Sequence, residues 1–321
     1  MQLYFLGTGA GMPSRQRNVS SLVLDLLDEC AGCWMFDCGE GTQHQILQAP
    51  VKLAKIHKLF VTHLHGDHIF GIPGLLASRS NHGAEEPLTV YGPTGIRQFI
   101  DTSLAVSDSR MKFELNIVEY AGEGIIHEEE RFWVEAARLD HRTECFGFRI
   151  VERDRTGSLD VEKLKRLGIP PGPVYGRLKQ GATVELPDGT IVDGKEFIGP
   201  PIPGRVVAIL GDTRYCRESV RLSRRADVLV HEATFSSDRK EQAELFCHST
   251  AAQAAEVARQ AEVRTLILTH ISSRYQNDGA EMLLKEARDV FPNTYLARDF
   301  WSYAVPPKRA RNDAACENRP H

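Results

Sequence analysis

The sequence predicts an α/β fold in which two similar halves stack on each other. Short apolar segments, each followed by glycine, proline or polar residues, recur up to residue 151 and again from residue 206. Segments with the apolar spacing of helices lie between them in both parts. Histidine or aspartate directly follows several of the apolar segments, and α/β folds concentrate their sites at such strand ends.

The first part is expected to contain seven strands and a helix. The strands cover residues 3–6, 21–27, 33–37, 58–62, 88–91, 131–139 and 146–151. The helix is expected over residues 67–80, with a loose Ile72-Pro73-Gly74 start.

The second part repeats this alternation. Strands are expected over residues 206–210, 228–230 and 266–269. Ser249 or Thr250 can cap a helix that runs to Arg259, because a hydroxyl accepts hydrogen bonds from the free N–H groups of the first turn. A further helix is expected over residues 280–290.

A segment of different composition separates the two parts. From Gly168 to Gly204, 15 of 37 residues are glycine or proline, which excludes a long helix or a central strand. Residues 186–190 form a turn signal between two short strands. We therefore expect residues 152–203 to form a flexible arm inserted into a domain of residues 1–306; the alternative is a surface insertion without function.

Composition points to a globular protein of the cytoplasm. The net charge is −4, so affinity for nucleic acid would require a local basic patch. No apolar run approaches the 18 or so residues of a membrane span, and the N-terminus lacks the pattern of a signal peptide. Seven irregularly spaced cysteines agree with unpaired thiols in a reducing compartment. Residues 307–321 lack periodicity and are expected to be disordered.

A dense group of metal-ligand residue types follows the predicted strand at residues 58–62. The segment His63-Leu64-His65-Gly66-Asp67-His68 holds four candidate ligands. His63 and His65 point to one side in an extended chain, and Gly66 lets the chain turn so that Asp67 and His68 can face a second ion. Imidazole and carboxylate suit zinc, iron or manganese.

Three further residues are candidate metal ligands, which would complete the number that two ions require. His141, Asp212 and His270 each come directly after an apolar strand, and Asp212 could bridge two ions. Four other histidines lack this context and are expected on the surface or in helices: His44, His57, His82 and His127.

These residues resemble the motif set of the metallo-β-lactamase superfamily, whose fold is an αββα sandwich with metals at its edge. Residues 36–43 resemble the first motif of the ribonuclease Z family of tRNA 3′-processing endonucleases, and residues 13–18 resemble its basic loop. His231-Glu232-Ala233-Thr234 and His248-Ser249-Thr250 match later motifs. The arm lies where the short form of the family carries its tRNA-gripping exosite, and the length matches that form, which is typically a homodimer.

The resemblance implies a role for each site residue. His63, His65 and His141 would hold one zinc ion, Asp67, His68 and His270 the other, and Asp212 would bridge them. Asp67 is also the expected general base. His248 would pass a proton to the leaving group, oriented by Glu232. Mn²⁺, Mg²⁺ or Co²⁺ are expected to substitute for the two Zn²⁺ ions.

The implied reaction removes the 3′ trailer from precursor tRNA. A hydroxide that bridges the two metals would attack the phosphodiester in line with the departing 3′ oxygen. The tRNA would keep a 3′-hydroxyl, and the trailer would begin with a 5′-phosphate. Some relatives also trim RNA ends, so an additional 3′ exonuclease activity stays open.

Local charge indicates where RNA would bind. Between Arg149 and Gly181, eight basic residues face four acidic ones, and such a patch can hold phosphates by charge and shape. The alternative is a solvated charged helix at residues 158–167 or a charged surface turn in the basic loop. The candidate substrate contacts are Arg15, Arg17, Asn18, Lys163, Lys165, Arg166, Arg177 and Lys179.

Two other functions remain open at this stage. The first is a hydrolase of the same superfamily that acts on a small molecule, such as an arylsulfatase, lactonase or cyclic-nucleotide phosphodiesterase; the arm argues against it. The second is an RNA-binding protein without activity that keeps zinc for folding. Structural zinc sites are closed, whereas this ligand set leaves room for water.

Overall fold

The structure, a computed structural model, describes residues 1–276 and 278–308. The chain divides into two compact units, of which the first comprises residues 1–151 and 206–306. The second comprises residues 152–205 together with Pro307 and Lys308. The prediction of a disordered tail covers residues 307–321, of which residues 309–321 lie outside the described residues.

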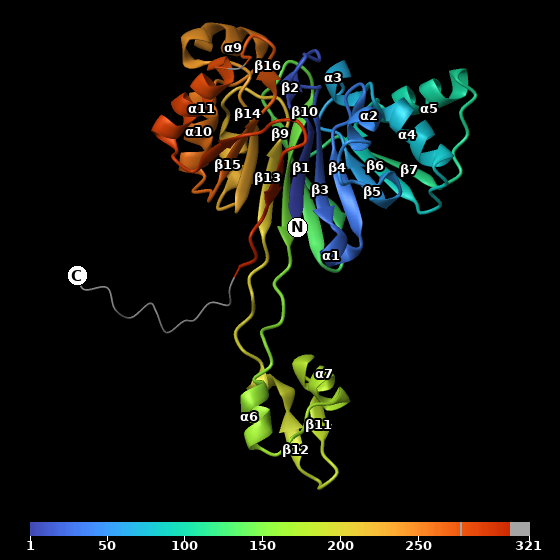
Figure 1. The fold of residues 1–321 in the computed structure, drawn as a ribbon, viewed down its shortest axis with the longest axis vertical. Coiled ribbons are helices and arrows are strands. Elements are labelled where there is room, and N and C mark those ends of the chain that lie inside the picture. Colours follow the sequence, from blue (N-terminus) through green and yellow to red (C-terminus); the bar gives the residue numbers. More distant parts are fainter. Residues whose placement is uncertain (277, 309–321) are drawn as a thin grey trace, which may run out of the picture. The chain divides into compact units, whose positions relative to one another are not determined.

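The first unit contains two sheets of seven strands each (Figure 1). In the first sheet, β4 to β7 are parallel to one another, and the others are antiparallel to their neighbours. Its strands in spatial order are β18 (Ser302–Ala304), β1 (Gln2–Gly7), β3 (Ser21–Leu26), β4 (Gly32–Phe36), β5 (Ile56–Phe60), β6 (Leu88–Pro93) and β7 (Leu115–Tyr120).

The second sheet has a parallel half built from β17, β15, β14 and β13. Its strands in spatial order are β17 (Thr294–Leu296), β15 (Leu266–Thr269), β14 (Val228–Glu232), β13 (Val206–Leu210), β10 (Cys145–Glu152), β9 (Phe132–Leu139) and β8 (Gly124–Glu128). Two short strands outside both sheets, β2 (Gly9–Ala10) and β16 (Ile271–Ser272), pair in parallel.

Helices cover the outer face of each sheet. The first sheet carries α1 (Leu27–Cys30), α2 (Thr42–Ile46), η1 (Leu53–Lys55), α3 (Gly66–Ile69), α4 (Ile72–Asn81) and α5 (Ile96–Val106) in its half of the chain. The second sheet carries α8 (Arg217–Ser223), η3 (Ser237–Arg239), α9 (Lys240–Phe246), α10 (Ala251–Gln260) and α11 (Asp278–Val290). Figure 1 shows the two groups of helices on opposite sides of the paired sheets.

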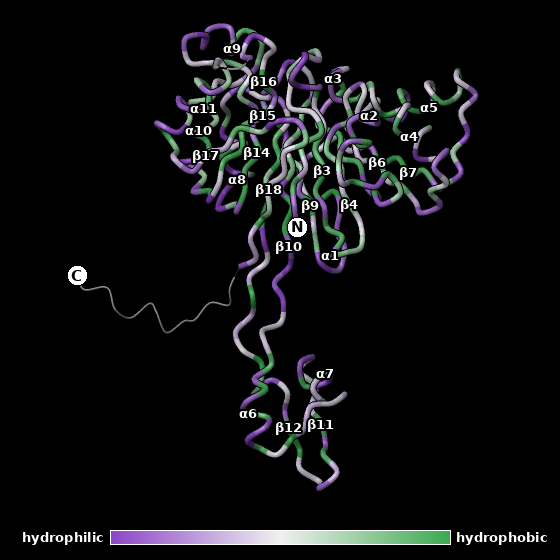
Figure 2. Tube along the Cα trace, in the orientation of Figure 1, coloured by the Kyte–Doolittle hydropathy of each residue, from purple (hydrophilic) through white to green (hydrophobic). Residues whose placement is uncertain are grey.

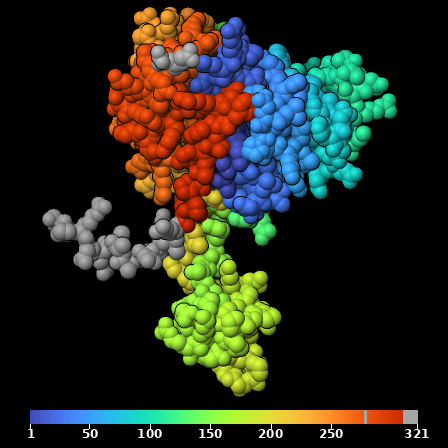
Figure 3. Space-filling view, in the orientation of Figure 1, coloured from blue at the N-terminus to red at the C-terminus, as the bar shows by residue number. Residues whose placement is uncertain are grey.

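Three apolar cores hold these layers together. One lies between the sheets and includes Phe36, Phe60 and Phe148; the other two lie between each sheet and its helices. Figure 2 shows the apolar residues following the central strands, and Figure 3 shows the two halves of the first unit adjoining. The fold is therefore the αββα sandwich that the resemblance implies.

Most of the expected elements are present, with differences where tertiary contacts intervene. The helix expected over residues 67–80 is two helices, α3 and α4. Gly71 is the reason, because its N–H donates to Cys38 O at 2.9 Å instead of continuing the helix. A side chain at Gly71 would also come within 2.0 Å of Gly39 O. In the first unit the prediction omitted the helices α1, α2, α5, α8 and α9 and the strands β2, β7, β8, β16, β17 and β18.

The expected cap of α10 is confirmed. The Thr250 side chain accepts a hydrogen bond from Gln253 N, and the Gln253 side chain accepts one from Thr250 N, which makes a capping box. This box fixes the backbone directly after His248, so it bears on the site described below.

The second unit is folded around a small core of its own. It contains α6 (Val161–Arg166), α7 (Pro173–Lys179), β11 (Thr183–Glu185), β12 (Ile191–Asp193) and η2 (Gly194–Phe197). The expected turn joins β11 to β12, with Gly189 at φ +84°. The core consists of Leu164, Ile169, Leu178, Val184, Val192 and Phe197. At its two ends, Arg205 Nε and Nη2 donate to the Glu152 carboxylate at 2.7 and 3.1 Å.

Two expectations from composition can be compared with the structure. No helix among residues 1–276 and 278–308 is long and apolar enough to span a membrane. The six cysteines within this described part of the chain have free thiols, and Cys33 and Cys38 are buried.

We expect Phe197→Ala to unfold the second unit selectively. Removing a buried phenyl group costs about 3–5 kcal/mol, and a core of this size rarely supplies more than about 3–5 kcal/mol in total. Limited proteolysis of the variant should cut within residues 152–205 and leave the first unit intact. Ile191→Ala, at a residue that is 72% exposed in the same unit, should keep the wild-type pattern. Resistance of the Phe197→Ala unit to protease would contradict this view of the core.

Candidate metal centre

The candidate site lies at the edge where strands of both sheets end. Asp212 follows β13 and His270 follows β15, two strands of the parallel half of the second sheet. His63 follows β5 in the first sheet, and His141 follows β9 in the second. The carboxyl ends of parallel strands share one edge, so strand order brings these four residues together from distant parts of the sequence.

One backbone hydrogen bond joins the two sheets at this edge, and a second continues from it within the second sheet. Phe146 N donates to Thr62 O at 3.0 Å, and Gly211 N donates to Phe146 O at 3.2 Å. Gly211 is required by the close approach, because an added Cβ would meet Cys145 Sγ at 2.6 Å and Thr62 Cβ at 2.7 Å. The residues directly after Thr62 and Gly211 are therefore held in fixed relation.

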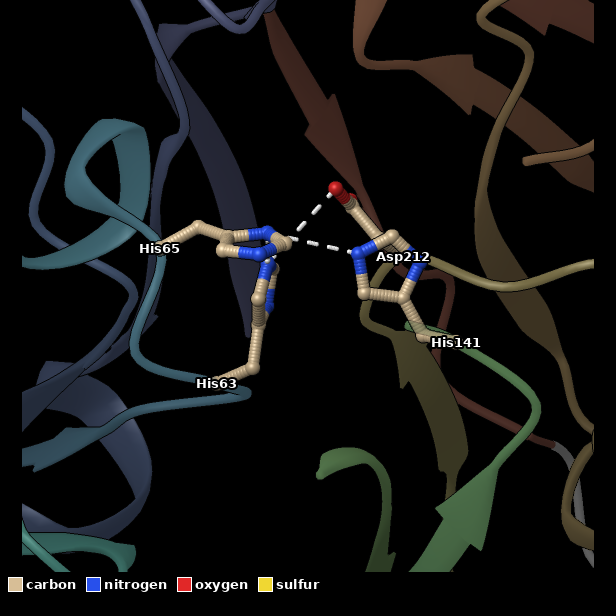
Figure 4. A group of neighbouring side chains, drawn as sticks. All are labelled: His63, His65, His141 and Asp212. Atoms are coloured by element: carbon tan, nitrogen blue, oxygen red, sulfur yellow. Dashed lines mark hydrogen bonds and ion pairs between the residues drawn. The ribbon is translucent and has the colours of Figure 1, made fainter. Parts of the chain in front are cut away.

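The first group of side chains is His63, His65, His141 and Asp212. Their ligand atoms all lie within 4.8 Å of one another. His63 Nε2 is 3.0 Å from His65 Nδ1, and His141 Nε2 is 3.3 Å from the same atom. Figure 4 shows the four side chains converging on one space, the two from the histidine motif on one side and His141 and Asp212 on the other.

The second group is Asp67, His68 and His270. Asp67 and His68 lie in α3, whose first residue, Gly66, packs closely against the Phe70 ring. His68 Nε2 and His270 Nε2 approach Asp67 Oδ2 to 3.5 and 3.4 Å.

Asp212 stands between the groups. Its Oδ2 atom is 3.7 Å from His63 Nε2 in the first group. The same atom is 3.5 Å from His68 Nε2 and 3.3 Å from His270 Nε2 in the second. All seven side chains predicted as ligands are thus brought together, around one shared carboxylate oxygen.

Asp37 fixes the orientation of two of the imidazoles. It accepts from His68 Nδ1 at 2.7 Å, and also from Thr62 N and Thr62 Oγ1 at 2.7 and 2.9 Å. The Thr62 hydroxyl gives its proton to Asp37, so it must accept the proton of His63 Nδ1, which lies 3.0 Å away. Both rings then carry their hydrogen on Nδ1.

Two other rings are fixed from the second sheet. Thr234 Oγ1 donates to Glu232 at 2.6 Å, so it must accept from His270 Nδ1 at 2.9 Å. His141 Nδ1 donates to the carbonyl of Cys247 at 2.8 Å. Four imidazoles therefore direct a nitrogen without hydrogen into the common space.

This arrangement fits positive ions. Bare nitrogens and ionised carboxylates cannot hydrogen-bond to one another, and His68 Nε2 is buried without a hydrogen-bond partner. A histidine whose second nitrogen donates to a carboxylate or carbonyl is the usual form of a metal ligand. The donor set of imidazole nitrogens and carboxylate oxygens suits zinc.

Shifts in pKa agree with this conclusion. Burial and the neighbouring imidazoles hold the pKa of His63 well below its ordinary value, which keeps the ring neutral. Burial also opposes charge on His68, but Asp212 and Asp37 outweigh it and raise the pKa of His68 well above its ordinary value. The space around His68 Nε2 thus strongly favours a positive charge, which a metal ion would provide.

His248 lies beside the second group with a partner of its own. Its Nδ1 is 2.9 Å from Glu232 Oε1 and 3.9 Å from Asp212 Oδ2. Glu232 is fully buried and also accepts from Thr213 N at 2.8 Å. Burial opposes a charge on His248, yet Glu232 raises the pKa of His248 to about 9, so the ring is protonated at neutral pH.

Five of the seven side chains line an open cleft of about 450 Å³, namely His65, Asp67, His141, Asp212 and His270, whereas His63 and His68 lie buried behind it. Besides ligand candidates, its lining includes Gly11, Arg142, Phe246, His248 and Arg274. Gly11 N donates to Asp67 Oδ2 at 2.8 Å, which connects the loop after β2 to the site. The cleft therefore gives a substrate direct access to Asp67 and His248.

The basic loop differs from expectation. Arg17 is buried, and its Nη1 donates to Thr8 Oγ1 and Ala297 O at 2.6 and 2.7 Å. Asn18 Nδ2 donates to Glu40 O at 2.8 Å. Both side chains hold the loop in place, so the prediction that Arg17 contacts substrate does not fit its burial. Arg15 is exposed, as a substrate contact requires.

The predicted contacts of the second unit are all exposed: Lys163, Lys165, Arg166, Arg177 and Lys179. Lys165 forms an ion pair with Glu162 at 2.8 Å, and the Lys163 ammonium lies over the Phe197 ring at 4.6 Å. α6 begins at Asp160, whose side chain caps Lys163 N. The unit therefore presents cations to solvent from both of its helices.

Sequence reasoning missed the roles of Asp37 and Thr234. Asp37 follows β4 directly and adopts φ +55°, so it shares the pattern of a polar residue after an apolar strand that revealed the ligands. Thr234 had no such signal. Of the histidines set aside, His44 and His82 are exposed, whereas His57 and His127 lie in strands β5 and β8 rather than in helices.

Family models match two parts of the chain. The model described as "Beta-lactamase superfamily domain" matches residues 189–271. The model described as "Anti-Pycsar protein Apyc1" matches residues 1–145. Each covers less than half of the chain.

Relatives match nearly its whole length. Ribonuclease Z of Geobacillus kaustophilus (strain HTA426) is 57% identical over 306 residues, which cover 95% of this chain and 99% of the relative. Ribonuclease Z of Bacillus cereus (strain G9842) is 57% identical over 305 residues, with the same coverage.

Solved structures agree. The crystal structure of human tRNase Z, short form, matches with a TM-score of 0.69 and 30% identity, over 95% of this chain and all of that one. A long form RNase Z from yeast matches with a TM-score of 0.64 at 19% identity, which supports the fold alone. The chain belongs to the ribonuclease Z family of metallo-β-lactamase-fold hydrolases.

Proposed function

We propose that this chain is a zinc-dependent endoribonuclease that removes the 3′ trailer from precursor tRNA. The observation that carries the proposal is the position of Asp212 Oδ2 between two histidine groups, 3.7 Å from His63 Nε2 and 3.3 Å from His270 Nε2. Relatives named ribonuclease Z, aligned over 95% of the chain, support the substrate and the reaction.

In this proposal the two groups would hold two zinc ions. His63, His65 and His141 would hold one ion, Asp67, His68 and His270 would hold the other, and Asp212 would contribute to both. Two such ions would supply an activated water and offset the charge that builds on the phosphoryl oxygens. Mn²⁺, Mg²⁺ or Co²⁺ could occupy the same oxygen and nitrogen ligands.

Asp67 is proposed to accept a proton from the attacking water. Burial tends to raise the pKa of Asp67, but the adjacent His270 and His68 rings outweigh it and keep the pKa below its ordinary value. The carboxylate therefore stays ionised at neutral pH. Its Oδ2 atom is held by Gly11 N as well, so it faces the cleft in a fixed orientation.

His248 is proposed to protonate the departing 3′ oxygen. It is charged at neutral pH because Glu232 outweighs the effect of burial, and it lines the same cleft as Asp67. Glu232 orients the ring through Nδ1, which leaves Nε2 for the leaving group. The tRNA would end in a 3′-hydroxyl, and the trailer would begin with a 5′-phosphate.

The second unit is proposed to grip the tRNA. Its exposed cations can bind the phosphates of a folded RNA by charge and shape, independent of sequence. Arg15 is proposed to bind phosphates near the cut. A homodimer in the cytoplasm, and trimming of RNA 3′ ends after the endonucleolytic cut, are further predictions from the family; light scattering of the purified protein tests the first.

Asp212→Asn should abolish both zinc binding and cleavage. The amide removes the charge that both groups share, so the loss should exceed the ~10–100-fold typical of changes to a ligand's hydrogen-bond partner. The measurements are zinc content by mass spectrometry and cutting of a precursor tRNA with mapping of both new ends. His44→Ala, an exposed histidine outside the cleft, is the matched control. Full zinc content in Asp212→Asn would overturn the shared-ligand assignment.

His248→Ala should slow tRNA cleavage by about 100- to 10,000-fold, the usual contribution of a general acid. Hydrolysis of bis(p-nitrophenyl) phosphate should change much less, because its leaving group departs without a proton. Zinc content should stay at the wild-type level. An equal loss on both substrates would show that His248 does not act on the leaving group.

Charge reversal on the second unit should weaken binding of precursor tRNA without changing the chemistry. Lys163, Arg166, Arg177 and Lys179 would be replaced by glutamate. The expected result is a higher KM for tRNA, a shallower dependence on salt, and unchanged hydrolysis of the small diester.

The control places four changes to glutamate at exposed cations of the first unit, namely Lys52, Lys55, Arg110 and Lys112, so the change in net charge is equal. Equal effects of the two sets on KM would argue against a specific grip by the second unit.

A further inference from the structure

Two large apolar side chains that line the cleft are exposed, Met12 and Phe246, and of these Phe246 is the aromatic one. Phe246 is the last residue of α9, is 44% exposed, and lines the cleft together with Asp67 and His248. The metal site and its proton relay do not use it. An exposed aromatic ring beside the proposed catalytic groups is a candidate for contact with a flat part of the substrate.

A second, buried ring supports Phe246 from behind. Phe235 is 4% exposed, and its ring is nearly parallel to that of Phe246, with centroids 6.4 Å apart and an interplanar angle of 13°. The Arg274 guanidinium lies 5.9 Å from the Phe235 centroid. Phe246 is thus part of a packed aromatic pair and not a freely moving side chain.

The same pair is tied to His248. The Phe235 centroid lies 6.2 Å from that of the His248 ring. Phe235 N donates to Ser249 O at 3.3 Å, and Ala251 N donates to Phe235 O at 3.0 Å. The backbone that presents His248 therefore also positions Phe235 and, through it, Phe246.

We propose that Phe246 stacks on the base of the nucleotide whose 3′ oxygen departs, a role that rests on the proposed function. The phosphodiester at the metal ions joins that nucleotide to the first one of the trailer. His248 delivers its proton to the oxygen on the tRNA side, and Phe246 belongs to the aromatic pair on the His248 side. An aromatic face binds any base, so Phe246 selects the position of the cut and not the identity of the base.

The test compares variants on three substrates. One is a complete precursor tRNA, the second lacks the base immediately 5′ of the cut, and the third lacks the base immediately 3′ of it. The variants are Phe246→Ala, Phe246→Tyr and Leu245→Ala. Leu245 is the matched control, because it is 67% exposed in the same helix but does not line the cleft. Zinc content and melting temperature report on folding.

On the complete substrate, Phe246→Ala should lower kcat/KM by about 5- to 100-fold, the range for one base–aromatic stack. Phe246→Tyr and Leu245→Ala should stay near wild type. Loss of the base 5′ of the cut should slow the wild type by a similar factor and slow Phe246→Ala no further. Should Phe246→Ala fail to fold, the wild-type enzyme is compared on the two abasic substrates alone. The proposal then requires slower cleavage when the base 5′ of the cut is missing than when the base 3′ of it is missing.

The inference would be overturned if Phe246→Ala and loss of the base 5′ of the cut each lowered kcat/KM and their factors multiplied when combined. An effect that vanishes only when the base 3′ of the cut is missing would also overturn it, since Phe246 would then contact the trailer. If the wild type cleaves the complete precursor normally and Phe246→Ala has no effect, the stacking proposal is refuted and the proposed function is not. Failure of the zinc-loaded wild type to cut the complete precursor at all refutes the proposed function as well.

Discussion

The site depends on where each imidazole carries its hydrogen. A histidine can offer a lone pair to the centre only if its other nitrogen is held as a donor, and the fold supplies an acceptor for that purpose from each sheet. Asp37, after β4, fixes His68 directly and His63 through Thr62. Glu232, at the end of β14, fixes His270 through Thr234 and His248 directly. Two buried carboxylates thus set the direction of four rings.

This constraint explains why the two sheets must meet closely at one edge. The candidate ligands come from the ends of β5, β9, β13 and β15, so a shift of one sheet against the other would separate the two groups from Asp212. The hydrogen bond from Phe146 N in the second sheet to Thr62 O after β5 of the first sheet resists that shift. In the core between the sheets, Phe148 of β10 packs against Phe36 and Phe60 of the first sheet, with ring centroids 5.8 and 5.6 Å apart, which adds a large buried contact.

The sequence predicted the fold and the candidate ligands well because both rest on local patterns. A polar residue directly after an apolar strand marks the end of that strand, where sites gather in α/β folds. That pattern identified His141, Asp212 and His270 without knowledge of the topology. What failed depends on tertiary contacts. The positive charge of Arg17 suggested a contact with RNA, but its buried guanidinium donates hydrogen bonds to Thr8 Oγ1 and Ala297 O instead. Gly71 ends α3 because Cys38 O, distant in sequence, accepts its N–H. The residues of the small core of the second unit are spread over a stretch rich in glycine and proline. They follow no helical or strand periodicity, so the sequence did not predict that they pack together.

Chemistry at the proposed metal centre acts on a phosphodiester that is the same in every RNA, so the choice of one bond must come from groups outside the ligand set. The exposed cations of the second unit would bind phosphates without reading sequence. Stacking on Phe246 would contribute about 1–3 kcal/mol for whichever base stands there. Neither interaction distinguishes one base from another, and both depend on the shape of the RNA. An enzyme with these two contacts would cut at a position defined by the fold of its substrate, which is what a set of precursor tRNAs with different trailers has in common.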